Sequence, residues 1–77
     1  MDEMKKLLAV LNDVNDEIDY ENETAMVDDG LIDSLTITRI IAAVAEEFGV
    51  YISTGDIEPE NFNSAQAMLD MIRRHRK

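Results

Sequence analysis

Residues 33–49 read DSLTITRIIAAVAEEFG, and this stretch predicts the helix around which the rest of the fold is organised. Its apolar residues recur at intervals of three and four, which is the spacing of one helical face. They are Ile37, Ile40, Ile41, Val44 and Phe48. Asp33 is suited to cap this helix, because its carboxylate can accept hydrogen bonds from N–H groups of the first turn. Gly49 fits the left-handed position that follows a helix, with Val50 as the apolar residue after it.

A further amphipathic helix is predicted on each side of this central one. The first of these helices carries an apolar stripe from Met4 to Val14, and the last carries one from Ala65 to Ile72. The residues of the two outer stripes are Met4, Leu7, Leu8, Leu11, Val14, Ala65, Met68, Leu69 and Ile72. Asn63 or Ser64 can cap the last helix, and Gln66 lies three residues after Asn63, as in a capping box.

One short helical turn is expected before the last helix, because Pro59 is favoured at the first position of a helix. Ile57 and Phe62 are expected to anchor this turn to the core. The stretch Val50-Tyr51-Ile52 alternates in character, which predicts a briefly extended segment. The sequence therefore predicts an all-α fold in one domain over residues 1–77. This fold is a small four-helix bundle, with three main helices and one short helix.

A long loop separates the first two predicted helices. Residues 15–33 are polar and acid-rich and have no helical period, and nineteen residues is long for a connection in a compact domain. Such loops are usually functional or disordered. Its scattered apolar residues indicate that it is pinned onto the core: Ile18, Tyr20, Met26, Val27, Leu31 and Ile32.

Charge and composition limit the function classes. The net charge is −10. Residues 1–72 hold all seventeen acidic residues and only three bases, so their net charge is −14, whereas the last five residues add +4. An acidic body repels nucleic acid and anionic membrane and attracts partners with basic faces. The chain has no cysteine, which excludes disulfides, thiolate zinc sites and thiol nucleophiles.

The chain has neither an apolar run long enough to span a membrane nor the layout of a signal peptide, so we expect a cytoplasmic monomer. Residues 13–24 have the acidic spacing of a calcium loop. However, Ile18 stands where an EF-hand needs glycine and Thr24 where it needs glutamate, so no metal site is predicted. The basic residues 73–77 complement the dipole of the last helix, or they contact a phosphate group.

Ser34 is the residue with most chemical interest. It falls where the loop ends and the central helix begins, beside free N–H groups and the positive end of the helix dipole, which favours a phosphate ester. Serine at a helix start is more commonly a cap, but Asp33 already fills that role. Leu35 is either an exposed recognition contact or an ordinary exposed leucine. The only histidine, His75, is too remote to act as a base for Ser34.

Several stretches resemble the acyl carrier protein family, including its peptidyl and aminoacyl carrier relatives. They are Gly30-Leu31-Ile32-Asp33-Ser34-Leu35, Glu46-Glu47-Phe48-Gly49-Val50, Asp56-Ile57 and Asn61-Phe62-Asn63-Ser64. The resemblance covers nearly the whole chain and agrees in length and helix order. It implies that a phosphopantetheinyl transferase attaches 4'-phosphopantetheine from coenzyme A to Ser34, between Asp33 and Leu35.

The resemblance further implies a freestanding carrier rather than an enzyme, with no catalytic residue of its own. The thiol of the arm would hold acyl or aminoacyl groups as thioesters. A chain without cysteine needs such an imported thiol. The implied partners are the phosphopantetheinyl transferase, a loading ligase or transacylase, and synthase enzymes of fatty-acid, polyketide or related biosynthesis.

The outward face of the central helix departs from the fatty-acid carriers, which are strongly acidic there. Its expected docking residues are Leu35, Thr38, Arg39, Ala42 and Glu46. Arg39 places a positive charge on this face, which favours a dedicated pathway with its own loading enzyme. Three alternatives remain: an aminoacyl or peptidyl carrier, a D-alanyl carrier, or an unmodified acidic helical adaptor that binds a basic partner.

Overall fold

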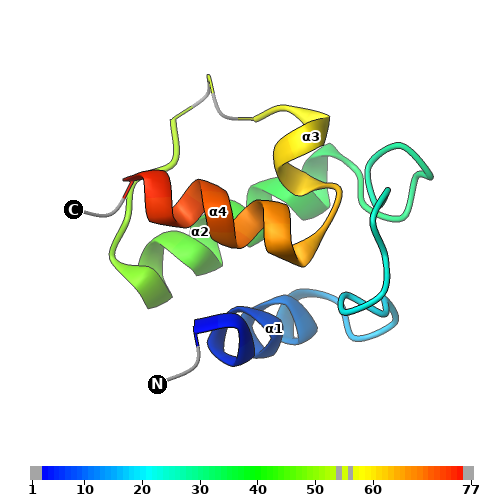
Figure 1. Ribbon diagram of the computed structural model, residues 1–77, viewed down its shortest axis with the longest axis horizontal. Helices are drawn as coiled ribbons and strands as arrows, with labels where there is room; N and C mark the ends of the chain where they lie inside the picture. Colours follow the sequence, from blue (N-terminus) through cyan, green and yellow to red (C-terminus); the bar gives the residue numbers. More distant parts are fainter. Residues whose placement is uncertain (1–2, 54, 56, 76–77) are drawn as a thin grey trace.

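The computed structural model describes residues 3–53, 55 and 57–75, which form four helices and no strand. The helices are α1 (Glu3–Val14), α2 (Ser34–Phe48), α3 (Pro59–Phe62) and α4 (Ala65–His75). Helix α1 packs against both α2 and α4, and α3 packs against α4. In Figure 1 the long loop between α1 and α2 lies at one end of the bundle, while the start of α1 and the end of α4 lie at the other. The predicted all-α bundle is confirmed.

Both predicted ends of α2 are confirmed. Asp33 is the N-cap, with extended backbone angles, and its carboxylate accepts a hydrogen bond from the Thr36 N–H at 2.9 Å. Gly49 follows the helix with φ of 65° and donates its N–H to the Ala45 carbonyl. A residue with a Cβ is disfavoured at this left-handed angle, so glycine ends the helix cleanly. Val50 is buried just beyond it.

One hydrophobic core joins the three long helices and the loop. Each predicted stripe contributes to it, and the structure adds two buried residues that the stripes omitted, Val10 and Met71. The fully buried side chains include Leu7, Leu11, Met26, Ile40, Val44, Phe62, Met68, Met71 and Ile72. Residues 50–52 form no strand, but they alternate as predicted, with Val50 and Ile52 buried and Tyr51 79% exposed.

Phe48 was expected in the core but lies at its edge. The ring is only partly buried, and the Lys6 ammonium of α1 lies 4.9 Å from the ring centroid. Helical spacing does not distinguish a central position from a flanking one, because the end of a stripe extends past its partner helix. The aromatic ring at the centre of the core is that of Phe62, with no exposed surface.

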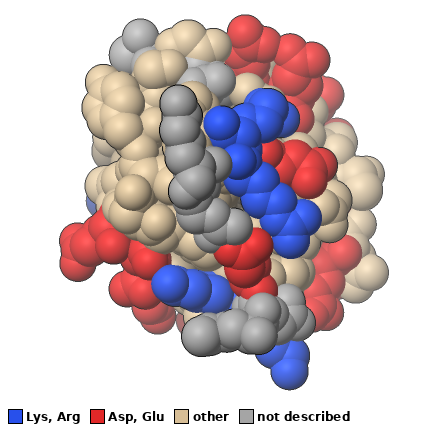
Figure 2. All heavy atoms as spheres, turned by 60° about the vertical axis from the view of Figure 1, so that its left-hand side comes forward, with Lys and Arg blue, Asp and Glu red and all other residues tan. Residues whose placement is uncertain are grey.

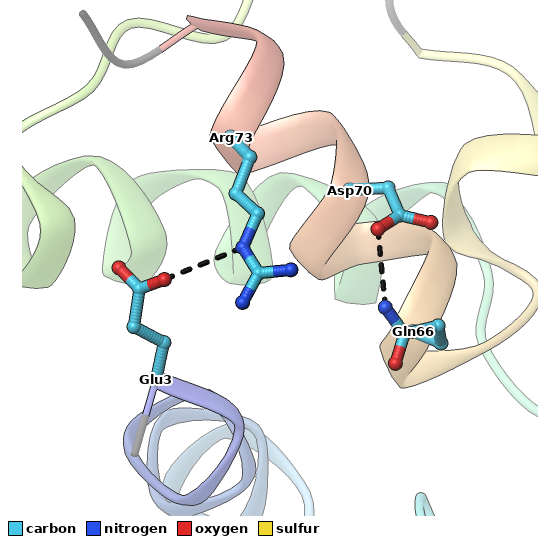
Figure 3. A network of polar contacts seen from close by, with 4 residues as sticks. All are labelled: Glu3, Gln66, Asp70 and Arg73. Atoms are coloured by element: carbon cyan, nitrogen blue, oxygen red, sulfur yellow. Dashed lines mark hydrogen bonds and ion pairs between the residues drawn. The ribbon is translucent and has the colours of Figure 1, made fainter. Parts of the chain in front are cut away.

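The junction between α3 and α4 differs in part from the prediction. Pro59 opens α3 and Phe62 anchors it, as expected, but Ile57 is 43% exposed and is not part of the buried core. Ser64 precedes α4, and its hydroxyl oxygen accepts a hydrogen bond from the Ala67 N–H at 3.0 Å. The predicted capping box does not form: Ser64 rather than Asn63 caps α4, and the Gln66 amide nitrogen donates to Asp70 (Figure 3).

The described part of the basic tail is tied to the fold. Figure 3 shows Arg73 of α4 facing Glu3 of α1, with Nε 3.3 Å from the carboxylate. Arg74 donates to the Asn61 side chain at 3.0 Å. In Figure 2 basic side chains lie among acidic ones on this face, so it is mixed in charge. Arg76 and Lys77 lie outside the described residues, as does Asp56. No described helix is both long and apolar enough to cross a bilayer.

Candidate functional site

The segment before α2 is a closed turn rather than an open loop. The Met26 carbonyl accepts hydrogen bonds from the N–H groups of Leu31 at 2.8 Å and Ile32 at 3.2 Å. Gly30 supplies the reversal, with φ of 74°, an angle that other residues rarely adopt. Met26 and Ile32 are both buried, so the two ends of the turn are fixed to the core. We call residues 26–32 the entry turn.

The loop as a whole is pinned as predicted. Tyr20 is buried and its hydroxyl donates to the Asn15 carbonyl at 2.7 Å, which closes the first half of the loop. Burial raises the pKa of the Tyr20 hydroxyl, and the nearby Asp16 carboxylate raises it further. Ile18 and Val27 are partly buried. Leu31 is the exception, with 41% of its surface exposed.

Ser34 follows the entry turn and the Asp33 cap, and it is the first residue of α2. Ser34 is exposed, and its hydroxyl makes no hydrogen bond within the described part of the chain. Its carbonyl accepts from the Thr38 hydroxyl at 2.9 Å. The Asp33 carboxylate caps the helix, and the hydrogen bond that it accepts from the Thr36 N–H lowers the pKa of the Asp33 carboxyl. The serine oxygen is therefore accessible and not needed to satisfy the helix end.

An exposed leucine lies on each side of Ser34 in the sequence. Leu35 is 62% exposed and Leu31 is 41% exposed. Among the described residues Tyr51 and Ile57 are the other large apolar side chains with such exposure, so two of four bracket the serine in sequence. Single exposed leucines need no explanation, but this pair surrounds the one idle hydroxyl at a helix start.

Three carboxylates also lie close to the serine in sequence. Asp28, Asp29 and Asp33 are all exposed, and their negative charge opposes the attraction of the α2 dipole for a phosphate. An enzyme that delivers a phosphate group here must bring cations of its own. The described residues contain no cluster of three metal-ligating side chains.

All five expected docking residues are exposed along α2. They are Leu35, Thr38, Arg39, Ala42 and Glu46. Arg39 makes no ion pair with a described residue, so its charge is presented to solvent. This face of α2 is mildly apolar and carries both signs of charge.

Proteins of the species Buchnera aphidicola are similar to this chain. The acyl carrier protein of Buchnera aphidicola subsp. Baizongia pistaciae (strain Bp) is 41% identical over 54 residues, which cover 70% of this chain and 67% of that protein. Those of the Acyrthosiphon pisum subspecies, strains Tuc7 and APS, are 34% identical over 71 residues, 92% of this chain and 85% of each relative. The chain belongs to the acyl carrier protein family. No family model and no solved structure matches it.

The geometry at Ser34 is compatible with the prosthetic arm that acyl carrier proteins bear. A tether needs a hydroxyl that faces solvent and takes no part in capping, and Ser34 meets both requirements. Sequence analysis named Asn63 as a candidate cap and as part of a stretch that resembles the family, but it missed the contact of this residue with the entry turn. The Asn63 side chain bonds to that turn. No sequence signal distinguishes an asparagine that caps a helix from one that holds a distant loop.

Proposed function

We propose that this chain is a carrier of acyl or aminoacyl groups, and that the carrier site is a 4'-phosphopantetheine arm on Ser34. The observation that supports this most is the exposed Ser34 hydroxyl, left idle because Asp33 caps α2. Relatives named acyl carrier proteins support the same role. When attached, the arm supplies the thiol on which a thioester forms, and this chain has no thiol of its own.

The chain's own residues present the serine rather than activate it. Asp33 accepts a hydrogen bond from the first turn of α2, so Ser34, the first residue of this helix, is held in a fixed position. Leu31 and Leu35 offer apolar contacts on either side. No histidine lies at the site among the described residues, and the adjacent Asp33 carboxylate is engaged in capping α2, so the proton of the Ser34 hydroxyl is left for the modifying enzyme to take. The chain is a substrate in this step and not a catalyst.

Intact mass tests this function. Incubation with coenzyme A and a phosphopantetheinyl transferase is expected to add about 340 Da, the mass of one arm. Ser34→Ala should abolish the gain. Its free energy of unfolding should fall by less than about 1 kcal/mol, because Asp33 keeps the cap.

Ser64→Ala is the matched control for the mass experiment. Ser64 also stands at a helix start, but its oxygen is used as the cap of α4. This variant should keep the full mass gain while losing about 1 kcal/mol of stability. No gain in wild type, or a gain that persists in Ser34→Ala, would leave the unmodified acidic adaptor as the better interpretation.

We further propose that the carrier serves a dedicated pathway rather than housekeeping fatty-acid synthesis. Arg39 supports this, because an exposed positive charge on α2 opposes a basic docking partner. A fatty-acid transacylase should load wild type poorly, and Arg39→Glu should raise the rate. Efficient loading of wild type that the substitution leaves unchanged would contradict the dedicated pathway without touching the carrier role.

A further inference from the structure

Asn63, between α3 and α4, makes an unusual set of hydrogen bonds to a segment 35 residues earlier. Its side-chain oxygen accepts from the N–H groups of Val27 at 2.9 Å and Asp28 at 3.1 Å. Its side-chain nitrogen donates to the Asp28 carboxylate at 3.2 Å. Its main-chain carbonyl accepts from the Met26 N–H at 3.0 Å. One residue therefore holds three consecutive residues of the entry turn.

The chemistry of this contact calls for an amide. Two backbone N–H groups face one end of the Asn63 side chain, which must therefore be the oxygen, and a carboxylate faces the other end, which must be the nitrogen. A carboxylate at position 63 would meet the Asp28 carboxylate without a donor. A hydroxyl is too short to serve both ends. We call the three side-chain hydrogen bonds the Asn63 clamp.

The clamp connects to Ser34 through the backbone. It holds Val27 and Asp28, the Asn63 main-chain carbonyl holds the neighbouring Met26 N–H, and the Met26 carbonyl in turn accepts from the N–H groups of Leu31 and Ile32. Ile32 leads directly to the Asp33 cap and to Ser34. Asn63 has no hydrogen bond to Ser34 itself, so any effect on the serine must pass through the entry turn.

The rest of the fold does not depend on the clamp. Asn63 is only half-buried, and the loop has separate apolar anchors in Tyr20, Met26 and Ile32. Loss of the clamp should therefore loosen residues 27–31 while the helices stay packed. Such local opening is common where hydrogen bonds near the surface, rather than apolar burial, hold a segment.

We propose that Asn63 is a positioning residue for the carrier site: its amide keeps the entry turn in the form that presents Ser34 and its flanking leucines to the modifying enzyme. This role rests on the proposed function. If only the closed turn is recognised, opening it lowers the competent fraction of the substrate. The KM for the carrier then rises while kcat is unchanged.

The test compares Asn63→Ala with two matched variants. Asn61→Ala makes the same truncation two residues earlier, at a side chain that accepts a hydrogen bond from Arg74 of α4. The double substitution Asp28→Asn with Asn63→Asp exchanges donor and acceptor, keeps the net charge, and rebuilds all three contacts of the clamp. Far-UV circular dichroism checks that each variant is helical. Asn63→Ser replaces Asn63→Ala if the latter does not fold.

Two readouts are needed. Amide hydrogen exchange at Val27 and Asp28 should become roughly tenfold faster in Asn63→Ala, and the KM of the phosphopantetheinyl transferase for the carrier should rise roughly tenfold with kcat within about twofold. Asn61→Ala should change neither quantity by more than about twofold, and the double substitution should bring both back to within about threefold of wild type.

The outcomes separate this role from the proposed function. Faster exchange with an unchanged KM would make the clamp purely structural and overturn the inference. A raised KM with unchanged exchange, or a fall in kcat alone, would also overturn it, because the turn would not be the intermediary. Absence of any mass gain in wild type would refute the carrier function itself, and the positioning role would fall with it.

Discussion

Phe62→Ala should destabilise this protein far more than Phe48→Ala, although both positions carry the same side chain. Phe62 has no exposed surface and lies where α3 meets α4. Removal of a fully buried phenyl ring costs about 3–5 kcal/mol, because the transfer free energy is lost and a cavity remains. A chain of this length has about 4–12 kcal/mol in total, so this variant loses a large part of it.

Phe48 is expected to contribute much less. Its ring is partly buried, so about half of the transfer free energy of a buried ring is at stake, roughly 1 kcal/mol. The Lys6 ammonium 4.9 Å from the ring centroid adds about 0.5 kcal/mol at such an open site. Little cavity is left, because solvent already reaches the ring. The expected loss for Phe48→Ala is therefore about 1–2 kcal/mol.

Urea unfolding followed by far-UV circular dichroism measures both losses, provided that the m values agree between variants. If Phe62→Ala does not fold, Phe62→Leu should still lose about 1–2 kcal/mol, since fewer buried atoms are removed. Equal losses at the two positions, or a larger loss at Phe48, would refute the assignment of Phe62 to the centre of the core and Phe48 to its edge.

Two further predictions follow from the titratable groups. The pKa of the Asp33 carboxyl lies below its ordinary value of 3.8, so its contribution to stability is complete above that value and is lost as pH falls through the lowered folded-state pKa. In Asp33→Asn the cap does not titrate, so this variant should lose less stability than wild type on acidification. Urea unfolding across pH measures the difference, and equal acid sensitivity of the two proteins would contradict this prediction. The pKa of Tyr20 lies above 10.0, so its contribution is complete below pH 10.0 and is lost as pH rises through the higher folded-state pKa. Tyr20→Phe should lose about 1 kcal/mol at neutral pH through the missing bond to Asn15, yet should be less sensitive to alkali, and a thermal melt series across pH checks both.

Sequence reasoning succeeded where local chemistry decides the outcome. The ends of α2 were predictable because a carboxylate before the first turn and a glycine after the last one satisfy backbone groups within a few residues. The exposure of Ser34 followed from the same reasoning, since a capped helix leaves the next hydroxyl idle. The stripes of α1 and α4 also pointed to most of the buried residues.

Sequence reasoning failed where two distant segments meet. Ile57 and Phe48 were expected to be buried because they are apolar and suitably spaced, but no neighbouring element covers them fully. Asn63 was expected to serve its own helix, but its amide bonds to residues 27 and 28 instead.

The sequence by itself determined the helices, the caps of α2 and the accessible serine, because hydrogen bonds within a turn and a repeating apolar face are local properties of the chain. Only the tertiary structure decided which aromatic ring fills the core and which side chain fastens the turn before Ser34. Both depend on contacts between residues far apart in sequence, and the type of a residue does not specify its distant partner.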